Sequence, residues 1–377
     1  SSFQGPISSH DLIQSSDFYI YDSEYLIITT GEYSPELQAL ANWKTQKGLA
    51  VQIVTVSDIA AAYTEVDLAA KIKQCITDYY DIYGTKWICL AGDYDDVPTR
   101  AVYAPEDYYW DGEFVCSDFY YMDLDNDWDA DGDGRWGENG EDSYDFYPEV
   151  YVGRLSANTA DEMQHLVQNI ITYETSPPIG DWINRTFYAG SFIMFDSDGD
   201  DDDVCDYPAI DYNRFNHFVA ETLENTTDYS WNEYYLAESE GLSPSTYSYN
   251  DTIDETHVMD ALNEGAAYGI IMGHGTPTRM VQFQFTQDYD GDELMDYSGD
   301  VLNYTSSYMM DGYAQPNFIT TSSNFNYSQD KLGFYVLEGC SVGTFNETED
   351  CLTETFLKSC AIGCIGSSEV TWVEDGW

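Results

Sequence analysis

The stretch YLIITTGEYSPELQALANWKTQKGLAVQIVTV, residues 25–56, decides the fold class of this 377-residue chain. It begins with a short apolar run, Tyr25–Thr29, and ends with a second one, Leu49–Val56. Between them, Ser34-Pro35-Glu36 opens an amphipathic stretch that Gly48 ends, which predicts a helix with Ser34 as its N-cap. A strand, a helix and a second strand in this order predict one unit of a parallel sheet.

The same alternation continues along the chain. Apolar runs predict further strands, and amphipathic stretches between them predict helices. The expected strands are 87–91, 149–152, 187–194, 231–236, 268–272, 333–337 and 361–365, and the expected helices are 67–83, 161–173, 212–223, 254–263 and 354–359. Continuous apolar strands separated by helices indicate mostly parallel sheets that are covered on both faces. Pro177-Pro178 reads as a linker, so we expect two side-by-side α/β subdomains, residues 1–178 and 179–377.

The charge excludes several classes of partner. The chain has 69 acidic and 13 basic residues, which gives a formal net charge of −56. Nucleic-acid phosphates and anionic lipid surfaces would repel such a polyanion. No apolar run approaches the roughly 18 residues of a membrane helix, so we expect no membrane insertion. The sequence leaves the oligomeric state open.

Two features favour a secreted or cell-surface location. One is the acidic composition, and the other is a set of six N-x-[ST] sequons that are typical of glycoproteins. The sequons begin at Asn184, Asn225, Asn250, Asn303, Asn326 and Asn346. An Asn- and Thr-rich loop composition would produce the same pattern without glycosylation.

A histidine and a cysteine follow neighbouring apolar runs. His274 stands between two glycines after GIIM, and Cys340 follows FYVLEG. Chemistry gathers at the carboxyl ends of strands in open α/β sheets, so these residues could meet across one substrate. An imidazole beside a thiol can activate it as a nucleophile, and the N–H groups of Gly275 and Cys340 could form an oxyanion hole. The alternative is that Cys340 is half of a disulfide and His274 a turn residue.

Several ordered motifs resemble the gingipain-type cysteine peptidases, peptidase family C25 of the caspase-like clan. These motifs are the opening LIITTGEYSPELQALANWKTQKGLAVQIV, the segments ICLAGDYDDVPTR and PEVYVGRLSANTADEMQHLVQNIITYE, the GHG and GCSVGTF turns, and the ending CLTETFLKSCAIGCIGSSEVTW. The resemblance implies a caspase/gingipain-like three-layer α/β sandwich. It also implies that Cys340 is the nucleophile and His274 the general acid/base.

The resemblance implies further roles at the substrate site. Gingipains select Arg or Lys at P1, the residue before the cleaved bond, with an Asp at the base of the S1 pocket, and Asp211 matches it best. Trp372 matches a tryptophan that walls this pocket, with Thr371 beside it. Asp211 could instead be a helix N-cap, and Trp372 a core aromatic. The family has a Glu near the end of the strand that matches GSFIM, where it supports the His. No carboxylate stands at the end of this strand here, so the group that orients His274 stays unassigned.

Acidic loops indicate bound Ca²⁺. Residues 127–138, DWDADGDGRWGE, carry acids and a glycine at the positions of a twelve-residue calcium loop. Its expected ligands are Asp127, Asp129, Asp131, Asp133 and Glu138. Two further acidic runs suggest second and third sites, with Asp288, Asp290, Asp292 and Asp296 in one and Asp196, Asp198 and Asp200 in the other. Each loop could instead be a solvated acidic surface.

Together these patterns predict a secreted, calcium-stabilised cysteine endopeptidase that acts on protein or peptide substrates. The alternative is a calcium-dependent extracellular surface or structural protein that retains an inactive peptidase fold. A third interpretation is an acyl hydrolase that uses the same dyad on esters.

Overall fold

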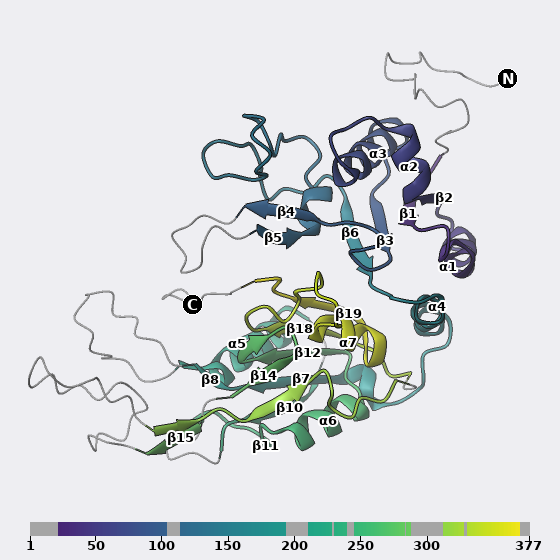
Figure 1. Ribbon diagram of the computed structural model, residues 1–377. Coiled ribbons are helices and arrows are strands. Elements are labelled where there is room, and N and C mark those ends of the chain that lie inside the picture. The colour runs from purple at the N-terminus through teal and green to yellow at the C-terminus, as the bar shows by residue number, and fades with distance from the viewer. Residues whose placement is uncertain are drawn as a thin grey trace, which may run out of the picture. The chain divides into compact units, whose positions relative to one another are not determined.

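The computed structural model describes residues 22–103, 114–193, 210–227, 230–239, 245–282, 284–287, 312–327 and 330–369. The chain forms two compact units, residues 1–171 and 172–377, and each is built on its own parallel sheet (Figure 1). The boundary between the units lies inside helix α4 (Ala160–Thr175), whereas the linker expected from the sequence ends at residue 178.

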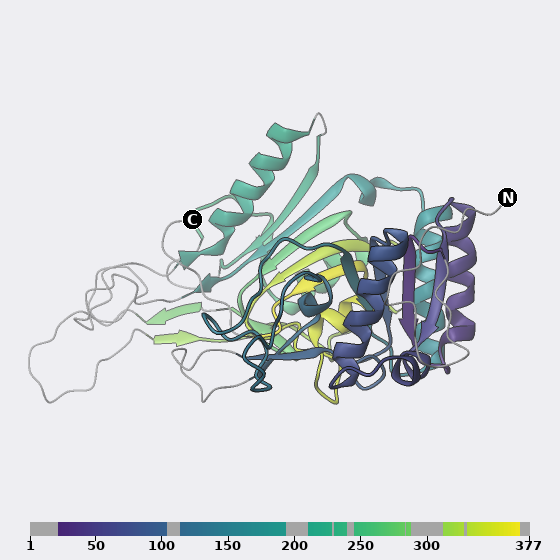
Figure 2. The same cartoon turned by 90° about the horizontal axis from the view of Figure 1, so that it is seen from above.

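The first unit contains a four-stranded sheet with the order β2-β1-β3-β6, in which all neighbouring strands are parallel. Its elements are β1 (Tyr25–Thr29), α1 (Ser34–Gln46), β2 (Val51–Thr55), α2 (Val56–Ala62), α3 (Leu68–Tyr83), β3 (Trp87–Ala91), β4 (Arg100–Tyr103), β5 (Phe114–Ser117), the 3₁₀ turn η1 (Asp118–Tyr121), β6 (Tyr151–Leu155) and α4. Helices α2 and α3 pack on one face of the sheet, and α1 and α4 lie against the other (Figure 2).

Local chemistry sets the helix boundaries of this unit. Ser34 is the first helical residue of α1 rather than its cap, because Tyr33 takes the N-cap position without a side-chain hydrogen bond. Asp67 caps α3 by accepting the Ala70 N–H at 2.8 Å. Val56, expected at the end of a strand, instead starts α2, which Thr55 caps.

The second unit contains a six-stranded, all-parallel sheet with the order β11-β10-β7-β12-β18-β19. Its elements are the 3₁₀ turn η2 (Asp181–Asn184), β7 (Arg185–Gly190), β8 (Phe192–Ile193), β9 (Ile210–Asp211), α5 (Tyr212–Thr226), β10 (Asn232–Ala237), β11 (Asp251–Thr252), α6 (Glu255–Glu264), β12 (Tyr268–Met272), β13 (His274–Thr276), β14 (Arg279–Val281), β15 (Gln284–Gln287), β16 (Gly312–Ala314), β17 (Asn317–Thr320), β18 (Gly333–Glu338), α7 (Leu352–Ser359) and β19 (Ala361–Gly366).

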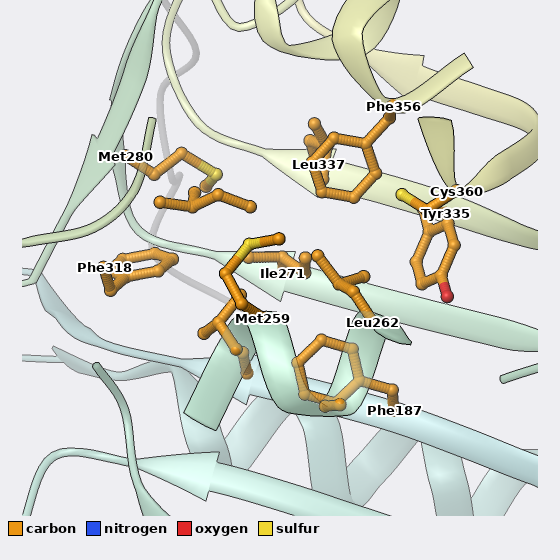
Figure 3. Close-up of a cluster of buried hydrophobic side chains, with 14 of the residues drawn as sticks. Phe187, Met259, Leu262, Ile271, Met280, Phe318, Tyr335, Leu337, Phe356 and Cys360 are labelled. Atoms are coloured by element: carbon orange, nitrogen blue, oxygen red, sulfur yellow. The ribbon is translucent and has the colours of Figure 1, made fainter. Parts of the chain in front are cut away.

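Helices cover both faces of this second sheet. Side chains of α6 and α7, among them Leu262 and Phe356, pack with Phe187, Tyr335 and Leu337 on one face (Figure 3). Helix α5 packs on the other face, where the cluster includes Tyr188, Ile270 and Met272 and is joined by the partly buried Val336. The result is a helix–sheet–helix sandwich, as the resemblance implied.

A small antiparallel sheet, β13-β14-β17, continues directly from β12 and was not expected from the sequence. Its strands are only three or four residues long and flank an acidic insertion, so their pattern is not recognisable in the sequence. Met280, Phe318 and Ile319 bury this sheet in the α6 and α7 core. In the described residues, no helix combines the length and the hydropathy that a membrane span requires.

Candidate active site

The two strand ends that carry His274 and Cys340 are in contact. Strands β12 and β18 are parallel neighbours, with Met272 opposite Glu338. Immediately beyond this pair, the Gly273 N–H donates to the Glu338 carbonyl at 3.0 Å. The pairing therefore continues to the residues just before the histidine and the cysteine.

Gly275 lies against the backbone of Cys340. A Cβ atom at position 275 would stand 2.6 Å from the Cys340 carbonyl oxygen and 3.0 Å from its nitrogen. Only glycine allows this approach, because real Cβ contacts are longer. The structure thus brings together the three residues of the expected dyad and oxyanion hole at one end of the sheet.

His274 is held by the small antiparallel sheet. It is the first residue of β13 and pairs with Val281 of β14. Its side chain is half-buried, and burial lowers its pKa below the ordinary value of 6.5. The imidazole is therefore mainly neutral near pH 7, which is the form that can accept a proton from a thiol.

The loop after Cys340 is tightly turned and tied down. Ser341 has φ = 57°, the one positive φ outside glycine in the described part of the chain. Its N–H donates to the Glu369 carbonyl at 2.9 Å, and the Gly343 N–H donates to the Ser367 carbonyl at 2.7 Å. The segment that precedes Thr371 and Trp372 thus runs beside the Cys340 loop.

Asp211 has a structural role at the start of α5. One carboxylate oxygen accepts the Asn213 N–H at 2.9 Å as the helix N-cap, and the other accepts the Ser245 hydroxyl at 2.6 Å. Burial raises the pKa of the Asp211 carboxyl, and it outweighs the two hydrogen bonds, which lower this pKa. Asp211 therefore ties α5 to the segment that follows β10.

Two residues to which the sequence motifs assign no role lie near Cys340. Glu338 ends β18, and burial raises its pKa. Tyr212, the first residue of α5, is buried, and its pKa is raised by burial and then by the neighbouring acidic groups of Glu338 and Cys340. The sequence signal for Glu338 was its position two residues before the cysteine, inside the strand.

Residues 127–142 form an acidic loop in the first unit. Asp129, Asp131 and Asp133 bring carboxylate oxygens within 4.8 Å of one another, and Asp131 forms a second such group with Glu138 and Glu141. Gly132 has φ = 77°, as the calcium-loop turn requires. Asp127 belongs to neither group, and its carboxylate accepts the Asp129 N–H at 3.3 Å.

Glu138 fits a cation-binding role. Its side chain is buried, with a relative exposure of 8%. Oxygen Oε1 accepts Arg135 Nη1 at 3.4 Å, but Oε2 is buried without a hydrogen-bond partner. A buried carboxylate oxygen without a partner is costly unless a cation or water binds it, so this donor set suits a hard cation.

A further acidic group, Asp123, Asp125 and Glu149, lies near this loop in sequence and was not singled out from the pattern. Asp123 is fully buried, but one of its oxygens accepts Trp128 Nε1 at 2.9 Å and the other accepts Asn126 Nδ2 at 2.9 Å. These hydrogen bonds account for its burial without an ion.

Several expected site residues lie outside the described part of the chain. They are Thr371 and Trp372 of the substrate site, Asp196, Asp198 and Asp200 of the third acidic run, and Asp288, Asp290, Asp292 and Asp296 of the second.

Comparison with known proteins decides the family. The sequence model of peptidase family C25 matches residues 21–376. The chain belongs to peptidase family C25. Gingipain R2 of Porphyromonas gingivalis strain W83 is 21% identical over 257 residues, which cover 67% of this chain and 28% of that protein. Gingipain R1 of Porphyromonas gingivalis has the same identity over 67% of this chain and 20% of its own length.

Solved structures show the same fold. The crystal structure of the Arg-specific cysteine proteinase gingipain R superposes with a TM-score of 0.59 at 17% identity, over 93% of this chain and 64% of that one. The complex of the RgpB pro- and mature domains of Porphyromonas gingivalis superposes with a TM-score of 0.58 at 17% identity, over 93% of this chain and 65% of that one. The chain thus spans under a third of the curated relatives' length and adopts the gingipain-like α/β fold.

Proposed function

We propose that this chain is a secreted, calcium-stabilised cysteine endopeptidase that cleaves peptide bonds with Cys340 and His274. The observation that carries the proposal is the contact of Gly275 with the Cys340 backbone, at the adjacent ends of β12 and β18. Membership of peptidase family C25 supports it, as do the motifs around both residues. The acidic composition and the sequons support an extracellular location.

The proposed mechanism uses the dyad in two steps. Neutral His274 takes the thiol proton, and Cys340 Sγ bonds to the scissile carbonyl carbon. The C–N bond then breaks as the imidazolium gives its proton to the leaving amine. In the second step His274 takes a proton from a water molecule, the water oxygen bonds to the acyl carbon, and the C–S bond breaks as the imidazolium returns a proton to Cys340 Sγ. The N–H groups of Gly275 and Cys340 would stabilise the oxyanion in both steps.

A preference for Arg or Lys at P1 is part of the proposal. The gingipain resemblance supports a basic P1 residue, although Asp211, the sequence match to the acidic residue of the S1 pocket, is engaged as the N-cap of α5. Cleavage profiling of a peptide library tests it, and a profile without a basic P1 bias would contradict it.

Calcium binding at residues 127–142 is also proposed, with Asp129, Asp131, Asp133 and Glu138 as carboxylate ligands. The unpartnered Glu138 Oε2 and the close carboxylate oxygens support this site. When bound, the ion would neutralise part of the charge of the loop and fix its turns. The ion would have no step in the reaction.

Active-site labelling tests the enzymatic proposal. A peptidyl chloromethyl ketone with Lys at P1 should alkylate Cys340 with one-to-one stoichiometry, and His274→Asn should slow this reaction by about 100-fold or more. Mass spectrometry locates the adduct. An inert Cys340 in the folded, calcium-loaded protein would favour the surface-protein alternative.

A further inference from the structure

Glu338 lies next to the nucleophile along the chain. It is the last residue of β18 and stands two positions before Cys340. Two residues of backbone span at most about 7 Å, so the two Cα atoms are close whatever the turn between them. Both side chains are half-buried, which leaves each of them partly open to solvent.

The face of the sheet on which Glu338 lies follows from strand alternation. Tyr335 and Leu337 point into the core under α6 and α7 (Figure 3). Val336 packs on the opposite face, against the α5 cluster. Successive side chains of a strand alternate between faces, so Glu338 projects on the α5 side, the side of Met272 and Tyr212.

The surroundings of the Glu338 carboxylate do not compensate its charge. Burial alone raises its pKa, and the described residues offer it neither a hydrogen bond nor an opposite charge. The acidic groups of Glu338 and Cys340 both raise the pKa of Tyr212, which places this ring near the two of them. A carboxylate in this setting favours the approach of a cation.

Asp211, by contrast, is already engaged. Its two oxygens accept hydrogen bonds from Asn213 and Ser245, and it caps α5. Its loss would disturb the start of the helix that carries Tyr212. A carboxylate whose two oxygens already accept hydrogen bonds binds a ligand less readily than one without hydrogen-bond partners.

We propose that Glu338 is a specificity-determining residue, whose carboxylate binds the cationic end of an Arg or Lys side chain at P1. This inference rests on the proposed peptidase function. Cys340 bonds to the carbonyl carbon of the P1 residue itself, so the P1 side chain starts within a few ångströms of the nucleophile. The long aliphatic stem of Arg or Lys would approach from the α5 side of the sheet, while its charge pairs with Glu338.

The test compares fluorogenic peptides that differ only at P1, with Arg, Lys or norleucine. Norleucine has the length of the Lys stem without its charge. For Glu338→Gln, the ratio of kcat/KM for Lys over norleucine should fall at least about 30-fold, because a partly buried charge pair loses one partner. The exposed Glu349→Gln is the matched control and should keep the wild-type ratio.

Asp211→Asn separates the two carboxylates. We expect it to melt at a lower temperature and to change the Lys-over-norleucine ratio by less than about threefold. A large loss of basic preference in Asp211→Asn with an unchanged ratio in Glu338→Gln would overturn the inference. An equal fall in kcat/KM for all three peptides in Glu338→Gln would also overturn it. That result is expected if Glu338 supports His274 instead of binding the P1 side chain.

Two further measurements keep the inference testable. If Glu338→Gln does not fold, Glu338→Asp retains the charge but withdraws it by one methylene, so the Arg-over-Lys ratio should rise several-fold. An unchanged Arg-over-Lys ratio would contradict the inference. Iodoacetamide labelling of Cys340 in every variant shows whether the dyad is intact, so failure of the peptidase proposal would appear as an unreactive cysteine in the wild type.

Discussion

The carboxyl group of Glu338 lies at the end of β18, and burial raises its pKa above the ordinary value of 4.5 for a glutamate. The folded state therefore keeps this proton more tightly than the unfolded state does. Stability from this group is present below the ordinary pKa and is lost as the pH rises through the folded-state value. Ionisation of Glu338 thus costs stability at pH values above its folded-state pKa, as expected where function outweighs packing.

This cost gives a prediction at the residue scale. Glu338→Gln should melt at a higher temperature than the wild type at pH 7, because the amide carries no charge to desolvate. The difference should shrink as the pH falls toward 4.5, where the wild-type carboxyl becomes neutral. Thermal melts across this range at saturating calcium measure it. A variant that melts lower than the wild type at pH 7 would show that the carboxylate has a stabilising partner.

Gly275 gives a second prediction at this scale. Gly275→Ala should reduce kcat/KM by about 100-fold or more, since the new methyl would displace the Cys340 backbone from the oxyanion geometry. Gly31→Ala is the matched control, because nothing lies within 4 Å of its added methyl. Peptide turnover by both variants measures this effect. An active Gly275→Ala would mean that the close approach of residue 275 to the Cys340 backbone is not needed for catalysis.

At the scale of elements, the sequence predicted the main strands well because parallel, doubly covered strands are continuous apolar runs. It also singled out His274 and Cys340 as a candidate dyad, since each follows an apolar run, and these two runs are neighbouring strands of one sheet. It could not show which face Glu338 occupies, because that depends on which helices pack on each side of β18. The short strands β13, β14 and β17 were missed because they carry too few residues for a period to be recognised.

The acidic loop 127–142 shows a similar limit. Spacing identified Asp129, Asp131, Asp133 and Glu138, which do lie in close carboxylate groups. The pattern ended at Glu138, so it missed Glu141, which the turn at Gly140 brings back toward Asp131. Local spacing finds ligands within a repeat but not those that chain reversal adds.

The loop carries a prediction at the element scale. Excess EGTA should lower the melting temperature by several degrees, since a ligand at 100 times its Kd stabilises the folded state by about 2.7 kcal/mol. Glu138→Gln should melt lower than the wild type in calcium and respond less to EGTA, whereas the exposed Glu349→Gln should respond as the wild type does. Differential scanning calorimetry measures these shifts. Identical melting with and without EGTA would exclude a stabilising calcium ion.

At the scale of the whole molecule, the net charge of −56 has two components. Part of it is concentrated in loops whose carboxylates can share a cation, as in residues 127–142. The rest is spread over the surface, where it opposes binding to phosphates and raises self-repulsion. Each unit has a parallel-sheet core of buried apolar side chains, and this burial opposes the repulsion.

A digest of a labelled peptide library in calcium, by the wild type and by Cys340→Ala, tests most directly whether Cys340 and His274 form a peptidase dyad. Mass spectrometry of the products reads both activity and P1 preference. We expect cleavage after Arg and Lys by the wild type and none by Cys340→Ala, which should melt as the wild type does. Equal cleavage by both proteins, or none by a folded, calcium-loaded wild type, would contradict it.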